Sequence, residues 1–134
     1  ELIEKCEEIF TNAFEAGWDN EYGGLLYFID ALGLPPESYE HDMKLWWPHN
    51  EILISSLMLY RDTGKEKYLG YFFKTFDYCL KHFYDKEYGE WYGYLRRDGL
   101  PTMPPCKGST FKGPFHLPRM LGMVDLMLGE LTDE

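Results

Sequence analysis

The stretch YDKEYGEWYGYL, residues 84–95, repeats much of an earlier stretch, GWDNEYGGLLYF, residues 17–28. Each contains the motif Asp-x-Glu-Tyr-Gly followed by aromatic and aliphatic residues, and the two motifs begin at Asp19 and Asp85. Because internal self-similarity is the sequence signature of a repeated structural unit, we interpret the copies as corresponding points of two such units. The repeat therefore favours a fold that is built from recurring supersecondary units.

Helical spacing of apolar residues predicts the rest of each unit. Four segments carry it: residues 2–17, 48–63, 65–83 and 118–128. Gly17 is expected to end the first helix, and Pro48 to lie in the first turn of the second. The short link at Gly64 predicts that the second and third helices form an antiparallel hairpin. The expected fold class is therefore all-α.

Two long connections separate these helices, residues 17–47 and 84–115, and each opens with a copy of the motif. We expect their segments GGLLYF and EWYGYL to be extended, with a turn at residues 97–99, so that the long loops contain short β-hairpins. A helical hairpin buries its apolar face by stacking on neighbouring hairpins, and such stacking can continue until a ring closes.

Composition limits the partners. The chain has 134 residues, 45% of them hydrophobic, which predicts one domain over residues 1–134. Its net charge of -10 disfavours nucleic acid and anionic membrane surfaces as partners. No apolar run approaches the roughly 20 residues that span a bilayer, and the opening ELIEKCEEIF does not resemble a signal peptide. Three cysteines without metal-ligand spacing predict reduced thiols, and hence a cytoplasmic protein.

Aromatic residues make up 18% of the chain, and those in the predicted helices are expected to be core. Others gather in the long loops: Trp18, Tyr22, Tyr27, Phe28, Trp46, Trp47, Trp91, Tyr92 and Tyr94. Flat apolar rings beside hydrogen-bonding side chains suit the C–H face and hydroxyl rim of a sugar. Carbohydrate is therefore the leading ligand class.

Three segments, KLWWPHNE (44–51), DKEYGEWYGYL (85–95) and KGPFHLPR (112–119), resemble signature stretches of the N-acylglucosamine 2-epimerase family, also called renin-binding proteins. The resemblance extends over residues 17–128. The family includes cellobiose 2-epimerases and aldose-ketose isomerases, but His49 in WWPH is more similar to the N-acylglucosamine branch.

The resemblance implies an (α/α)6 toroid around a sugar pocket, with this chain as its C-terminal part. It implies interconversion of N-acyl-D-glucosamine and N-acyl-D-mannosamine, by removal and return of a proton at C2 between two histidines. His116 matches the second of these histidines. The first histidine and an active-site arginine match nothing in the chain, so we expect a partial domain whose activity alone is doubtful. It would need the missing part of the toroid or self-associate.

His116 is also the best candidate base from the residues alone. It directly precedes a proline-led helix, whose positive N-terminal end favours a neutral imidazole, although a capping or packed histidine is the alternative. Glu51 matches a family glutamate that binds substrate or orients the catalytic groups, or else it complements a helix dipole. Arg119 either holds a sugar oxygen or pairs with a loop carboxylate.

Lys44, Trp46, Trp47 and His49 are expected to line or support the substrate pocket, with simple packing as the alternative. His41 and His82 are given no role. No metal site is expected and no cofactor is required. The family implies ATP as an effector, but the glycines at 17, 23 and 24 do not form a phosphate-binding loop. A noncatalytic carbohydrate-binding or protein-interaction module remains the alternative to an enzyme.

Overall fold

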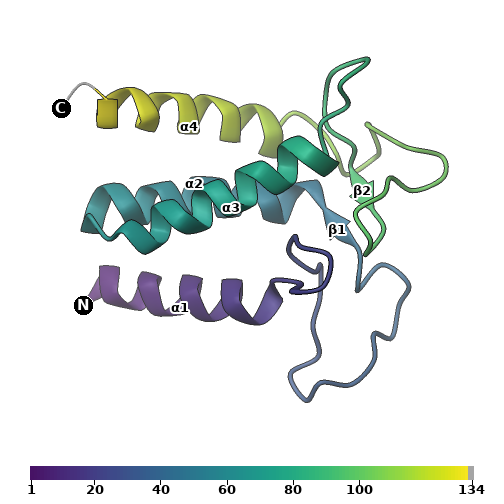
Figure 1. Ribbon diagram of the computed structural model, residues 1–134, viewed down its shortest axis with the longest axis horizontal. Coiled ribbons are helices and arrows are strands. Elements are labelled where there is room, and N and C mark those ends of the chain that lie inside the picture. Colours follow the sequence, from purple (N-terminus) through teal and green to yellow (C-terminus); the bar gives the residue numbers. More distant parts are fainter. Residues whose placement is uncertain (133–134) are drawn as a thin grey trace.

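Four roughly parallel helices, with the long loops gathered at one end, dominate the computed structural model, which describes residues 1–132 (Figure 1). The helices are α1 (Leu2–Gly17), α2 (Trp46–Thr63), α3 (Glu66–His82) and α4 (His116–Thr132). Two short strands, β1 (Lys44–Leu45) and β2 (Tyr94–Leu95), lie in the loops. The predicted helical fold class is confirmed. Within residues 1–132 no helix combines the length and apolarity needed to cross a membrane.

Helix ends follow local chemistry, but α2 and α4 begin earlier than the sequence predicts, and α4 ends at Thr132 instead of residue 128. Gly64, at φ 66°, ends α2 in the left-handed conformation and donates its amide to the Tyr60 carbonyl at 2.7 Å. Both α2 and α4 begin two residues before the expected proline, because a proline is tolerated anywhere in the first turn, where amides lack helical partners. His116 is consequently the first residue of α4 rather than a loop residue.

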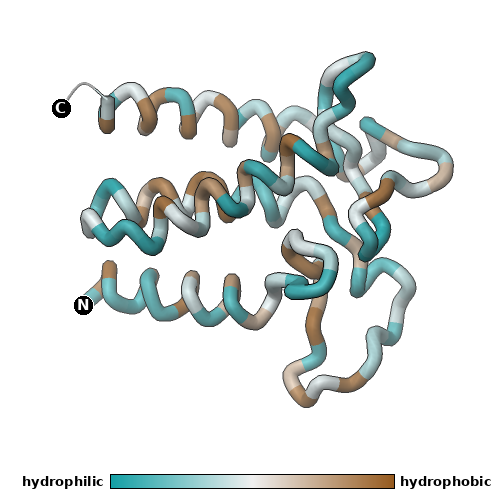
Figure 2. Tube along the Cα trace, viewed as in Figure 1, coloured by the Kyte–Doolittle hydropathy of each residue, from teal (hydrophilic) through white to brown (hydrophobic). Residues whose placement is uncertain are grey.

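The core forms around α2, which is buried on most of its surface and packs against α1, α3 and α4. Leu53 and Leu57 of α2 are fully buried, as are Cys79 of α3 and, nearly, Met120 of α4. Figure 2 shows α4 turning most of its hydrophobic residues towards α2 and α3. The expected antiparallel α2–α3 hairpin is present, closed by Gly64.

The two copies of the repeated motif fold alike, as a first turn (residues 18–25) and a second turn (residues 84–91). In each turn the aspartate carboxylate accepts the amides two and three residues later, and its carbonyl accepts the amide four residues later. One β-bridge closes each turn, Trp18 with Leu25 and Tyr84 with Trp91. The sequence repeat is therefore a structural repeat.

One position differs between the turns. Gly24 (φ 76°) and Glu90 (φ 65°) occupy the same place, and both are left-handed. A Cβ on Gly24 would lie 2.5 Å from the Tyr78 ring, so only glycine fits the first turn. Glu90 is the one non-glycine residue with positive φ among residues 1–132, a conformation that costs about 1–2 kcal/mol.

The strand pair joins the two long loops to each other. Lys44 pairs with Leu95, and Leu45 with Tyr94, in antiparallel register. The predicted turn at 97–99 is present, since the Gly99 amide donates to the Arg96 carbonyl and a bridge joins Leu95 to Pro101. This pairing brings the starts of α2 and α4 towards the same region of the molecule, where the loops meet (Figure 1).

Candidate functional site

A hollow of about 540 Å³ lies where α2 and α4 begin. Its lining is largely aromatic and comes from both long loops and both helix starts: Tyr27, Tyr39, Glu40, Leu45, Trp46, Trp47, Tyr94, Phe111 and His116. We call it the aromatic pocket. A larger, open hollow of about 840 Å³ shares Tyr39, Glu40 and Tyr94 with it and continues over the turn after β2.

A histidine, a glutamate and an arginine meet at the edge of this pocket. His116 Nδ1 lies 2.8 Å from Glu51 Oε1, and Arg119 Nη2 donates to the same oxygen. Glu51 projects from the second turn of α2, while His116 and Arg119 share one face of α4 because they are three residues apart. The packing of α2 against α4 therefore assembles the cluster.

Charge in the cluster determines which nitrogen of His116 is free. Partial burial acts to raise the pKa of Glu51, but the hydrogen bonds from Arg119 and His116 outweigh it and lower that pKa. An ionised carboxylate can only accept, so the His116 proton belongs on Nδ1, facing Glu51. In the neutral form of the ring, Nε2 is then the nitrogen without a proton and can accept one.

Two tryptophans from the start of α2 flank this imidazole. The centre of the Trp47 ring lies 5.7 Å from that of His116, and Trp46 lies at 6.4 Å. Trp46 is only 2% exposed and packs edge-on against Tyr94, so it offers little of its surface to the pocket that it lines. Trp47 is half-buried and offers more of its surface to the pocket.

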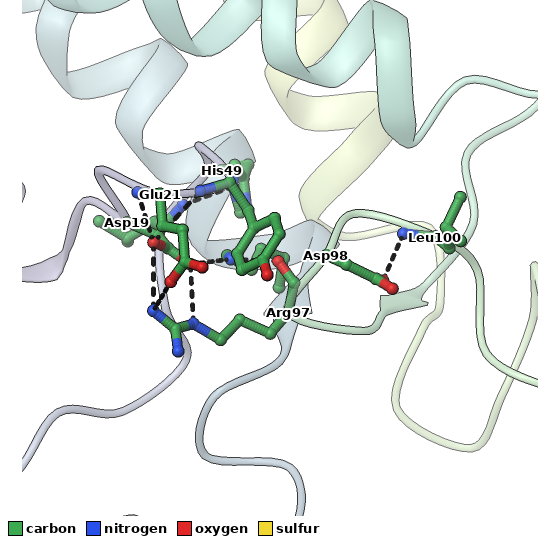
Figure 3. Close-up of polar contacts among 9 residues, drawn as sticks. Asp19, Glu21, His49, Arg97, Asp98 and Leu100 are labelled. Atoms are coloured by element: carbon green, nitrogen blue, oxygen red, sulfur yellow. Dashed lines mark hydrogen bonds and ion pairs between the residues drawn. The ribbon is translucent and has the colours of Figure 1, made fainter.

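Lys44, next to the pocket residue Leu45 in β1, lies in a buried ion pair. Its ammonium is 2.7 Å from Asp19 Oδ2 and donates to the Arg97 carbonyl at 2.6 Å. Arg97 also donates to Asp19 at 3.0 Å and to Glu21 at 3.2 Å, which joins the first turn to the loop after β2 (Figure 3). Burial raises the pKa of Asp19, but these cations outweigh it and hold the pKa well below its usual value.

His49 is fully buried, and both of its ring nitrogens have partners in the protein. Nε2 accepts the Leu25 amide at 2.9 Å, and Nδ1 donates to the Leu45 carbonyl at 2.7 Å. Burial lowers the pKa of His49 to about 4, which keeps the ring neutral. The imidazole thus fastens the first turn to α2 (Figure 3).

The structure therefore brings together five of the seven site residues expected from the sequence: His116, Glu51, Arg119, Trp46 and Trp47. Lys44 and His49 are fully buried nearby, and direct contact with substrate stays a prediction for all seven. Sequence reasoning missed the pocket residues Tyr39, Glu40 and Phe111. The aromatic composition of the loops was the available signal for Tyr39 and Phe111. Within residues 1–132 no three His, Cys, Asp or Glu side chains form a group able to hold a metal ion.

Comparison with solved structures identifies the class of fold. The chain superposes on a D-mannose isomerase with a TM-score of 0.80 at 23% identity, covering 96% of this chain and 32% of that one. It superposes on the cellobiose 2-epimerase of Bacillus thermoamylovorans B4167 with a TM-score of 0.67, also at 23% identity, covering 91% and 29%. The fold is a segment of the helical toroid of sugar epimerases and isomerases.

Sequence comparison identifies the family. The model of the N-acylglucosamine 2-epimerase family matches residues 1–112. The chain is 50% identical to the N-acylglucosamine 2-epimerase of Mus musculus over 118 residues, and 48% identical to that of Homo sapiens. These alignments cover 88% of this chain but only 28% and 27% of the relatives. The chain belongs to the N-acylglucosamine 2-epimerase family and spans less than a third of these relatives' length.

Proposed function

We propose that the intact protein containing this chain interconverts N-acyl-D-glucosamine and N-acyl-D-mannosamine. The observation that carries the proposal is the His116–Glu51 hydrogen bond, which leaves Nε2 of a pocket histidine free to accept a proton. The choice of sugar follows the relatives: N-acylglucosamine 2-epimerases are about 50% identical, whereas a D-mannose isomerase and a cellobiose 2-epimerase are 28% and 29% identical over shorter spans.

In the proposed reaction His116 Nε2 exchanges a proton with C2 of the ring-opened sugar on one face. A second acid–base group on the opposite face, outside this chain, completes the inversion. Glu51 holds the imidazole in position and stabilises its protonated form, as the carboxylate partner of a catalytic histidine does. Arg119 supplies positive charge near the oxygen that becomes negative when the C2 proton leaves. These steps use side chains alone, so we propose that no cofactor is required.

Replacement of His116 tests the assignment. In the intact protein, His116→Ala should lower epimerisation and deuterium exchange at substrate C2 by about 10²–10⁴-fold, the usual contribution of a positioned acid or base. His41→Ala is the matched control, because within residues 1–132 the His41 side chain hydrogen-bonds only to Ser38, in its own loop. Full retention of C2 exchange in His116→Ala would remove this residue from the mechanism.

Parallel assays with N-acylglucosamine, mannose and cellobiose separate the proposed reaction from those named for the more distant relatives. The alternative of a noncatalytic sugar-binding module is tested with the 134-residue chain alone. Sugar binding at ordinary affinity by this chain, with no turnover by the intact protein, would favour that alternative.

We further propose that the protein works in a reducing compartment such as the cytoplasm. Cys6 and Cys106 are exposed and Cys79 is buried, and all three are free thiols. Alkylation of the protein in denaturant at the moment of cell lysis, followed by mass spectrometry, should find all three cysteines modified.

A further inference from the structure

The segment that leads into α4 is fastened to the second turn. Lys107 Nζ lies 2.5 Å from Asp85 Oδ2 and donates to the Gly89 carbonyl at 2.8 Å. Lys112 Nζ donates to both carboxylate oxygens of Glu90, at 2.6 and 2.7 Å. We call residues 103–115 the lead-in loop. Through Phe111 this loop also lines part of the aromatic pocket.

We propose that Glu90 is a positioning residue for the reaction: through Lys112 it holds the lead-in loop so that Phe111 and His116 face the pocket. The inference rests on the proposed function, because it assigns His116 the role of base. It adds a residue that lies outside the aromatic pocket.

The Lys112 side chain has little freedom. It is only 6% exposed. Its Cδ would lie 3.1 Å from a Cβ placed on Gly93, so the aliphatic part of the side chain runs against the backbone just after the second turn. The Gly93 amide donates to the Cys106 carbonyl at 3.0 Å, which ties the same two segments together. Packing holds the aliphatic part of Lys112, and both oxygens of the Glu90 carboxylate bind its ammonium. Together these contacts fix the lead-in loop at Lys112.

The backbone conformation of Glu90 indicates that its side chain has a functional role. The equivalent residue in the first turn is Gly24, the residue that a left-handed position normally takes. The second turn instead carries a glutamate there, at φ 65°. Residues held in disfavoured backbone conformations concentrate at functional sites. Here the side chain that glycine would lack is the one that binds Lys112.

The Glu90–Lys112 ion pair lies close in the sequence to two residues of the aromatic pocket. Phe111, next to Lys112, lines the pocket, and His116 follows four residues after Lys112 as the first residue of α4. Only three residues separate Lys112 from His116, so a displacement of Lys112 acts close to the start of α4. Releasing Lys112 should therefore shift both the pocket wall and the imidazole.

The test uses the intact protein and separates position from stability. Glu90→Gly removes the anchor and also relieves the backbone strain, so we expect an unchanged or higher Tm together with a kcat lowered about tenfold, as small misplacements of catalytic groups cause. KM should change less than twofold. Lys112→Met should lower kcat similarly. Glu87→Gln, in the same turn and exposed, is the control and should behave like the parent.

A double variant with the two charges swapped and hydrogen exchange at the Gly93 amide complete the test. The double variant Glu90→Lys with Lys112→Glu should recover most of the lost kcat, and Gly93 amide exchange should speed up in Glu90→Gly and Lys112→Met. Parental kcat and Gly93 exchange in both single variants would overturn the proposal, as would a kcat loss that only follows a fall in Tm. If the parent turns over none of the sugars, the proposed function fails, while Gly93 exchange still decides whether Glu90 anchors the loop.

Discussion

At the scale of single residues, His49 shows how burial turns an expected pocket residue into an internal fastening. Burial lowers its pKa from 6.5 to about 4, because the protonated ring would lose both solvent and the Leu25 amide. Between these two pH values the unfolded chain binds a proton at this site and the folded chain does not. Stability should therefore fall as the pH drops from 6.5 to 4, by roughly 3 kcal/mol from this residue.

Urea unfolding across that pH range checks the expectation. His49→Gln should flatten the dependence of unfolding free energy on pH between 6.5 and 5, before the carboxylates titrate. Burial also lowers the pKa of His82, which is less deeply buried, so His82→Gln should remove a smaller part of the slope. An unaltered slope in His49→Gln would contradict the assignment.

Gly24 offers a second prediction at the scale of residues. The stability cost of its positive φ can be measured separately from the cost of crowding by Tyr78. Gly24→Ala would place a Cβ at positive φ and 2.5 Å from Tyr78. Gly33→Ala is the matched control, with φ 73° and no heavy atom within 4 Å of the new Cβ. We expect the control to lose about 1 kcal/mol of unfolding free energy through φ alone, and Gly24→Ala to lose about 1–3 kcal/mol more through overpacking. Equal losses in chemical denaturation would show that Tyr78 moves aside freely.

At the scale of elements, each turn captures a lysine from the segment that runs into the next helix. Asp19 binds Lys44, just before α2, and Asp85 binds Lys107, in the loop before α4. The repeat thus reproduces a connection between loop and helix as well as a turn. This correspondence explains why Asp-x-Glu-Tyr-Gly recurs: the carboxylate closes the turn and holds the following segment.

The two connections differ in burial, which predicts different costs. Lys44 is fully buried, whereas the Lys107 side chain is 27% exposed. Asp19→Asn would leave a buried ammonium without its anion, which should cost roughly 3–5 kcal/mol of unfolding free energy. Asp85→Asn should cost less, because water can solvate Lys107. Because the pKa of Asp19 is depressed in the folded chain, its contribution is present above pH 3.8 and is lost as the pH falls towards the folded pKa. A larger loss for Asp85→Asn, measured by urea unfolding, would refute this ranking.

Local patterns in the sequence predicted the elements better than the connections between them. The four helices and the Gly64 hairpin follow from spacing and from glycine, which act within a few residues. The pairing of Lys44–Leu45 with Tyr94–Leu95 depends on loops far apart in the chain, and nothing local encodes that register. For the same reason the Asp19–Arg97 pair went unpredicted. The family resemblance predicts that Glu51 orients the catalytic groups, but its direct contact with His116, at 2.8 Å, depends on the packing of α4 on α2.

At the scale of the whole molecule, α1 and α4 are the two outer helices. Figure 1 shows α2 and α3 between α1 on one side and α4 on the other. Both outer helices expose large apolar side chains: Leu2 and Ile9 on α1 are 79% and 68% exposed, and Leu121 and Leu126 on α4 are 56% and 69% exposed. In a toroid, neighbouring hairpins cover such flanks. The chain spans only 28% of its Mus musculus relative, so we propose that the remaining hairpins cover them in the intact protein.

This arrangement predicts that the 134-residue chain on its own self-associates through its two flanks. Sedimentation velocity should show the average mass rising with concentration, because exposed apolar patches of this kind promote association. Ile9→Glu with Leu126→Glu should shift the chain towards monomer, since both flanks then carry charge. Leu34→Glu is the control: Leu34 is 61% exposed but lies in the first long loop, away from both flanks, and its replacement should leave association unchanged. A dilute, cooperatively unfolding monomer at every concentration would mean that α1 and α4 tolerate water without neighbours, and the proposed covering by further hairpins would lose its physical basis.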